Sequence, residues 1–197
     1  IQGFKIMTMN DFSRRKFIGA LSLGTAHVLF SNPLYAATRL SSVDPLQKVV
    51  LGNSGLETTL LGVGTGVSGG DRSSFLTRQD KNKSIAVLRH AYDRGFRQFD
   101  TADTYGTHEL MAEALKGMKR EELTIASKIW TRGGGIPEPE RPDMDMVVDR
   151  FRKEMNIDYI DLVQIHCMVK SDWTDLMRKQ MDQLEDLKSK GVIKAHG

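Results

Sequence analysis

Four residues that can do acid–base chemistry stand at or just after the ends of short apolar runs in this sequence: Asp100, Tyr105, Lys128 and His166. Residues of these types can transfer a proton to a substrate oxygen on which negative charge builds during a reaction. Free tyrosine, with a pKa of about 10, is a slow acid at neutral pH, and a neighbouring ammonium favours its ionised form. Lys128 can supply that charge, Asp100 can hold the lysine, and His166 can donate a second hydrogen bond to the developing oxyanion.

The same four residues also have a purely structural interpretation. Asp100 and Lys128 would then form an ion pair, and Tyr105 and His166 would be core residues with satisfied hydrogen bonds. That interpretation is common for any one such residue alone. The presence of all four, spread over three apolar runs, favours the catalytic interpretation.

The apolar runs themselves are typical of buried strands, and helical patterns fill the gaps between them. Helices are predicted over residues 84–94, 108–115, 143–155 and 173–190, a hairpin over 49–51 and 58–63, and a further strand over 193–196. This alternation predicts an α/β fold with a parallel sheet. In a barrel of that kind, polar residues at the C-terminal ends of several strands point into one site.

The segments that carry the four residues closely resemble the aldo-keto reductase family: FRQFDTADTYG at 96–106, SKIW at 127–130 and DYIDLVQIH at 158–166. The resemblance runs from about Val49 to Gly197. It implies a TIM-type (β/α)8 barrel and a nicotinamide-dependent carbonyl reductase that favours NADPH without excluding NADH.

The resemblance also implies a role for each of the four residues. In this family the residue that matches Tyr105 is the proton donor, and those that match Lys128 and Asp100 pair beside it. The residue that matches His166 orients the substrate carbonyl group.

The loop at Gly64 and Thr65 matches the family segment that lies against the nicotinamide, next to Asp100. The family often has tryptophan where this chain has Gly66, so the pocket wall is expected to differ there. Residues 64–69 also fit a GxGxxG dinucleotide fingerprint, but that fingerprint needs a helix to begin at the glycines. A polar loop follows instead, so we reject a Rossmann fold.

Two further residues are predicted to line the substrate pocket together with His166. Trp130 follows Lys128 by two positions, and Cys167 follows His166. A tryptophan packed on the rim of the barrel is an equally open interpretation for Trp130.

Composition limits the classes of protein to be considered. The net charge is +3, and it resides in residues 1–36, because the remaining acidic and basic residues balance. The basic pI therefore gives no support to a nucleic-acid-binding face. Cys167 is the single cysteine, which excludes an internal disulfide. The histidines other than His166 do not have the spacing typical of metal ligands, so no metal site is predicted.

The first 37 residues have the layout of a twin-arginine signal peptide. A basic SRRKFI segment at 13–18 precedes an apolar stretch to Phe30 and the small residues Ala36 and Ala37. This predicts export to the periplasm or beyond through the twin-arginine machinery. The apolar stretch is too short for a stable membrane span. A membrane anchor or a frayed N-terminal helix are the alternatives.

The expected organisation is therefore a signal peptide over 1–37, a linker over 38–48 and an incomplete barrel of about five strands over 49–197. The leading hypothesis is the N-terminal fragment of an exported enzyme that reduces a small-molecule carbonyl substrate. Two alternatives are a non-catalytic nicotinamide-binding redox sensor and an inactive truncated product. The intact set of four residues argues against the sensor, because a pure binding protein does not need the acid.

Overall fold

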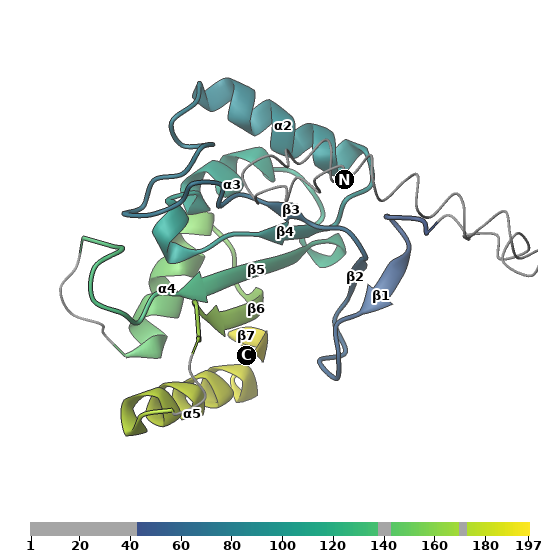
Figure 1. Ribbon diagram of the computed structural model, residues 1–197. Helices are drawn as coiled ribbons and strands as arrows, with labels where there is room; N and C mark the ends of the chain where they lie inside the picture. Colours follow the sequence, from purple (N-terminus) through teal and green to yellow (C-terminus); the bar gives the residue numbers. More distant parts are fainter. Residues whose placement is uncertain (1–42, 138–142, 170–172) are drawn as a thin grey trace, which may run out of the picture. The chain divides into compact units, whose positions relative to one another are not determined.

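The computed structural model describes residues 43–137, 143–169 and 173–197, and residues Asp44–Gly197 form one compact unit (Figure 1). The predicted signal peptide and residues 38–42 of the predicted linker lie outside the described residues. Within the described residues, no helix is long and apolar enough to cross a membrane.

A five-stranded parallel sheet forms the centre of the unit, with its strands in sequence order. The strands are β3 (Val63–Gly64), β4 (Gln98–Asp100), β5 (Thr124–Ile129), β6 (Ile160–Ile165) and β7 (Ile193–His196). The predicted α/β class and the barrel-type order of parallel strands are confirmed, and the structure is a part of such a barrel. The predicted strand at 193–196 has the observed bounds.

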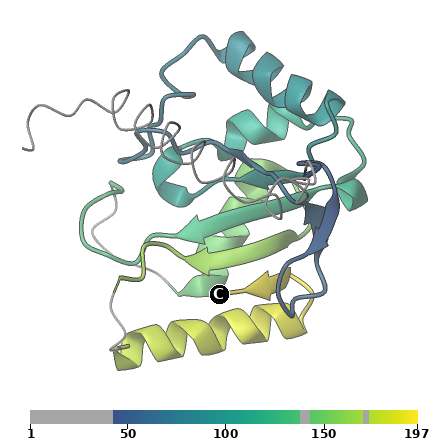
Figure 2. The same cartoon turned by 45° about the vertical axis from the view of Figure 1, so that its right-hand side comes forward.

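Helices connect successive strands and cover one face of this sheet (Figures 1 and 2). They are α2 (Lys81–Asp93), α3 (His108–Ala114), α4 (Met144–Met155) and α5 (Asp175–Ser189), with 3-10 turns η3 (Asp103–Tyr105) and η4 (Arg120–Glu122). Helix α2 begins before its apolar stripe because the Asp80 side chain accepts a hydrogen bond from the Lys83 backbone N–H and caps it. On α5 the buried residues are Gln180, Leu184 and Leu187.

The core lies between the sheet and its helices. Fully buried side chains from strands and helices meet there, among them Leu88, Phe99, Val148, Phe151, Ile160, Val163 and Leu184. Burial of each large aliphatic side chain contributes about 1.5–3 kcal/mol. This packing holds the strands in one register, so the groups at their C-terminal ends share one edge.

A hairpin of β1 (Lys48–Val50) and β2 (Glu57–Thr59) lies at the opposite, N-terminal ends of the strands (Figure 1). The Arg97 backbone N–H donates to the Thr59 hydroxyl at 3.1 Å, and the Thr124 hydroxyl donates to the Glu57 carbonyl at 3.3 Å. The predicted hairpin is thus present. Lys48, placed in the linker by the sequence, is instead the first residue of β1, and the predicted strand over 58–63 is interrupted at residues 60–62.

Candidate active site

Four separate segments bring the predicted catalytic residues to one edge of the sheet. Asp100 is the last residue of β4, Lys128 lies near the end of β5, and His166 directly follows β6. Tyr105 ends the short turn η3, which follows β4. Because parallel strands end at a common edge, the four side chains lie together.

Lys128 is held between two acceptors. Its ammonium donates to the Asp100 carboxylate and, at 3.1 Å, to the Thr101 carbonyl oxygen. The lysine nitrogen lies 5.5 Å from the centre of the Tyr105 ring. The predicted pairing of Lys128 with Asp100 beside Tyr105 is therefore present in the structure.

Tyr105 and His166 face one another. The Tyr105 hydroxyl lies 3.4 Å from His166 Nε2, and the two rings meet edge to face, with centres 5.5 Å apart and an interplanar angle of 85°. This distance is at the long end for a hydrogen bond. Two polar atoms with this separation can both reach a small acceptor placed beside them.

The electrostatics of Tyr105 differ from the expectation. Burial, and then the negative charge of Asp100, raise the pKa of the Tyr105 phenol above its usual value of 10.0. From the sequence, the ammonium of Lys128 is expected to act on the phenol, with Asp100 only holding the lysine. In the structure Asp100 both pairs with that ammonium and acts on the phenol, so Tyr105 is kept as a protonated acid.

Burial, and then the positive charge of Lys128, lower the pKa of the His166 imidazole below 6.5. The ring is therefore neutral at neutral pH. Among the described residues, Nδ1 is buried without a hydrogen-bond partner. With the single proton on Nε2, the ring presents a donor toward Tyr105 and leaves only an acceptor unpaired.

Thr65, predicted as a cofactor contact, is almost fully buried beside Asp100. It is 1% exposed, and its hydroxyl lies 2.8 Å from the hydroxyl of Thr107 and 3.0 Å from the Asp100 carbonyl oxygen. Thr107 in turn contacts the hydroxyl of Thr101 at 2.7 Å. This buried network ties the end of β3 to β4. Cofactor contact by Thr65 stays a prediction.

The neighbouring glycines differ in the space that a side chain would have. Gly64 is exposed beside Asp100, and a Cβ there would meet nothing within 4 Å. The space beside Gly66 is instead filled by the Tyr105 ring. A loop follows as far as Asp80, and α2 begins at Lys81, so the glycines do not open a helix and the rejection of a Rossmann fold is confirmed.

The two predicted pocket residues both lie next to His166. The Trp130 ring meets the His166 ring at 83°, with centres 5.3 Å apart, and its indole N–H donates to the Gly134 carbonyl. Cys167 is exposed, and its carbonyl oxygen accepts from Arg132. The geometry places both beside the site; substrate contact by either residue stays a prediction.

An ionic network under Tyr105 was missed in the sequence. Arg72 and Arg150 bind the two oxygens of Asp103, at 3.1 and 2.9 Å. Arg150 also binds Glu154 at 2.9 Å. These arginines are 31 and 47 residues from Asp103, and no local spacing signals such pairs.

The same network reaches the strand of Lys128. Glu154 contacts His108 Nδ1 at 2.6 Å, and His108 Nε2 contacts the hydroxyl of Ser127 at 2.9 Å. Ser127 directly precedes Lys128. The turn that carries Tyr105 and the strand that carries Lys128 are therefore joined through buried and half-buried polar groups.

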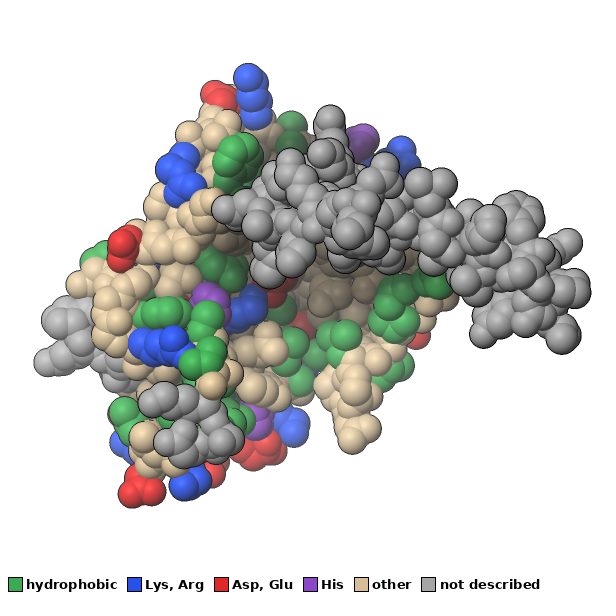
Figure 3. Space-filling model, in the orientation of Figure 1, with side chains coloured by type: hydrophobic (Ala, Val, Ile, Leu, Met, Phe, Trp, Pro, Cys, Tyr) green, Lys and Arg blue, Asp and Glu red, His purple; other side chains and the backbone are tan. Residues whose placement is uncertain are grey.

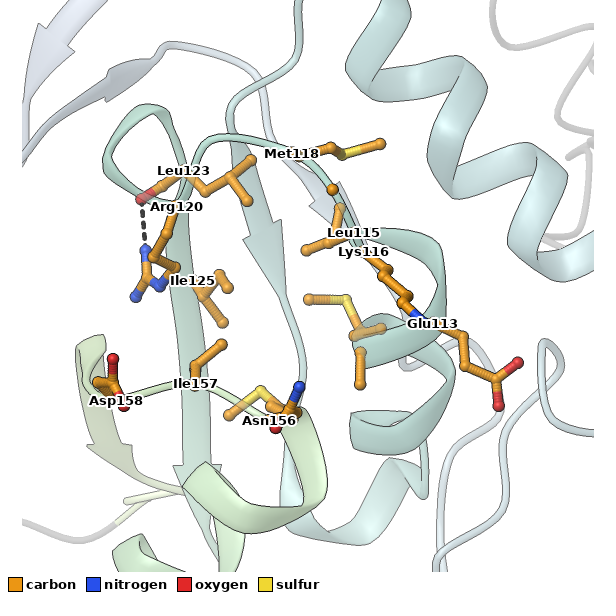
Figure 4. Close-up of a pocket in the computed structure, with 14 residues that line it drawn as sticks. Glu113, Leu115, Lys116, Met118, Arg120, Leu123, Ile125, Asn156, Ile157 and Asp158 are labelled. Carbon is orange, nitrogen blue, oxygen red and sulfur yellow. Dashed lines mark hydrogen bonds between the residues drawn. The ribbon is translucent and has the colours of Figure 1, made fainter.

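A cavity of about 410 Å³ lies elsewhere, between α3, α4 and the start of β5. Apolar side chains, including Leu115, Met118, Ile125 and Ile157, line it (Figure 4). None of the four predicted catalytic residues lines this cavity. Within the described part of the chain, no group of three or more His, Cys, Asp or Glu side chains is placed to hold a metal ion.

Comparisons with known proteins identify related sequences. A sequence model described as the Aldo/keto reductase family matches residues 60–197. Probable aldo-keto reductase 1 of Glycine max is 30% identical over 159 residues, which cover 77% of this chain and 44% of that protein. Methylglyoxal reductase DkgA of Escherichia coli O157:H7 is 31% identical over 115 residues, which cover 57% of this chain and 38% of that protein.

Solved structures show the same relationship. The holo form of aldo-keto reductase AKR11C1 from Bacillus halodurans superimposes with a TM-score of 0.60 at 28% identity, over 77% of this chain and 49% of that chain. The chain spans about half or less of the length of the curated relatives it matches, with 44%, 48% and 45% for three of them.

Proposed function

Because the chain belongs to the aldo/keto reductase family, whose members are oxidoreductases that use NAD(P)H, we propose that the protein reduces an aldehyde or ketone to the alcohol with Tyr105 as proton donor. The observation that carries this proposal is the pair formed by the Tyr105 hydroxyl and His166 Nε2, 3.4 Å apart. For the cofactor we propose NADPH, on the strength of the sequence resemblance.

The residues beside the pair fit a flat nicotinamide ring. Gly64 is exposed and has open space where a side chain would lie, and it pairs with Asp100 in the sheet. Asp100, with a side chain 34% exposed, lies at the same opening. These two residues would hold the ring, and the reduced ring, when bound, supplies the hydride.

The residues of this chain supply the proton and the orientation. A carbonyl oxygen beside Tyr105 and His166 accepts hydrogen bonds from the phenol and from Nε2–H. As negative charge grows on that oxygen, the Tyr105 proton transfers to it, and the nearby Lys128 ammonium stabilises the resulting phenolate. The raised pKa of Tyr105 keeps the proton in place until the oxygen becomes basic.

The role of the first 37 residues also belongs to this proposal. The paired arginines and the apolar stretch after them support export through the twin-arginine machinery. The enzyme would then reduce its small-molecule substrate in the periplasm or outside the cell. This part of the proposal rests on the sequence alone.

The test is Tyr105→Phe in the full-length protein, which removes the proton and keeps the ring. Loss of a positioned general acid lowers the rate on the order of 100- to 10,000-fold. Cofactor binding, measured by quenching of protein fluorescence, should be retained. Tyr92→Phe is the matched control, because it removes a hydroxyl that contacts Glu122 on the protein surface. If Tyr105→Phe keeps the activity of the Tyr92→Phe control, Tyr105 is not the acid.

A further inference from the structure

The turn formed by residues 66–69 packs directly against the ring of Tyr105. The Gly69 N–H donates to the Gly66 carbonyl at 3.0 Å and closes the turn. A Cβ at Gly66 would lie 2.3 Å from two ring carbons of Tyr105, and a Cβ at Gly69 would lie 2.7 Å from a third. Contacts this short do not occur, so neither position can hold a side chain while Tyr105 keeps its place.

Close approach, and not backbone conformation, is what requires glycine here. Neither Gly66 nor Gly69 has a φ in the left-handed region. Alanine therefore meets no left-handed backbone strain in this turn. At Gly66 the three nearest atoms to an added methyl group all belong to Tyr105, whereas at Gly69 the methyl group would also lie 2.9 Å from the Gly66 carbonyl oxygen.

The same loop also contacts the residues on either side of Tyr105. Gly106, the next residue, approaches Arg72 so closely that a Cβ would lie 1.9 Å from the Arg72 carbonyl oxygen. The Arg72 side chain binds Asp103, at the start of η3, at 3.1 Å. Loop 66–72 thus contacts η3 at its first residue, at the tyrosine ring and at the residue after it.

We propose that Gly66 and Gly69 are positioning residues for Tyr105, forming a seat without side chains that fixes the phenol opposite His166. This inference rests on the proposed function of Tyr105 as the acid. Proton transfer needs hydrogen-bond distance, and a displacement of about 1 Å can cost on the order of 100-fold in rate. Two of the three glycines of the GxGxxG pattern thereby gain a role unrelated to phosphate binding.

The first test is Gly66→Ala in the full-length protein. The kcat for carbonyl reduction should fall about 100-fold, while the KM for NADPH changes little. Gly70→Ala is the matched control, because it adds the same methyl group in the same loop where nothing lies within 4 Å. Thermal unfolding of both variants measures any general loss of structure, and Gly69→Ala replaces Gly66→Ala if the latter does not fold.

The second test combines Gly66→Ala with Tyr105→Phe. If the glycine acts through the phenol, the added methyl group costs nothing more once the phenol proton is absent, so the two losses are not additive. Two results would overturn this proposal. One is a kcat of Gly66→Ala equal to that of Gly70→Ala, and the other is the same fold loss from Gly66→Ala in the wild-type and Tyr105→Phe backgrounds. If Tyr105→Phe alone leaves the activity unchanged, the proposed function fails instead.

Discussion

The Tyr105 hydroxyl and His166 Nε2 lie 3.4 Å apart although 61 residues separate them in the chain. Basic and histidine side chains gather beside hydrophobic ones over this end of the strands (Figure 3). The pKa values of the two side chains are shifted apart, because burial raises the pKa of Tyr105 and lowers that of His166. Both groups therefore keep one protonation state across the neutral range.

This separation predicts the pH dependence of the reduction. Between the ordinary values of 6.5 for histidine and 10.0 for tyrosine, the imidazole is neutral and the phenol is protonated. The single-turnover rate should be constant in that range and should fall only above pH 10.0, as the phenol ionises. A change of the single-turnover rate with pH inside this range, if it disappears in His166→Gln or Tyr105→Phe, would contradict the prediction.

Replacement of Asp100 by asparagine should lower the pKa of Tyr105. The carboxylate of Asp100 raises that pKa, whereas the Lys128 ammonium that remains in the variant favours the phenolate. Ultraviolet difference titration against Tyr105→Phe isolates the one phenol. Asp149→Asn, which removes an exposed carboxylate paired with Lys153 on α4, is the control and should leave the titration unchanged. An equal or higher pKa in Asp100→Asn would show that Asp100 acts mainly by holding Lys128.

Glu154 should contribute to acid stability. Burial alone would raise the pKa of Glu154, but hydrogen bonds from His108 and Arg150 outweigh burial and lower it from 4.5 to about 2. Because the folded-state value is depressed, the stabilisation is complete above pH 4.5 and is lost as the pH falls toward 2.

Glu154→Gln is the direct test of that contribution. The variant should unfold more easily at neutral pH, by about 1–3 kcal/mol, and its free energy of unfolding should change less than that of the wild type between pH 4.5 and 2. Urea titrations across this range measure both effects. Glu113→Gln removes a surface carboxylate paired with Lys81 and serves as the control. Parallel pH profiles for the wild type and Glu154→Gln would refute the prediction.

Replacement of Arg14 and Arg15 together by lysine should leave the protein folded and active inside the cell. Lysine keeps the charge but lacks the planar donor fork of the guanidinium groups. Cell fractionation followed by an activity stain locates the enzyme. Replacement of Lys5 by arginine, outside the paired motif, should not alter its location. Unchanged export of the double variant would mean that the leader uses another route or is not a signal.

Local patterns in the sequence were sufficient to predict the sheet and its helices. The longest strands, β5 and β6, lie in largely buried runs, the helices have apolar stripes, and the carboxyl ends of parallel strands must share an edge. The convergence of Asp100, Lys128 and His166 followed from that rule, because each lies at or just beyond the end of a strand.

The environments of these residues depended on contacts that no local pattern encodes. The side chain of Thr65 turns into a buried threonine network, the two partners of Asp103 come from distant segments, and the ring of Tyr105 lies on Gly66. The pKa of Tyr105 is raised because burial and the carboxylate of Asp100 act on the phenol. Sequence therefore determined which groups meet, whereas tertiary packing decided their distances, exposure and charge, because those depend on residues far apart in the chain.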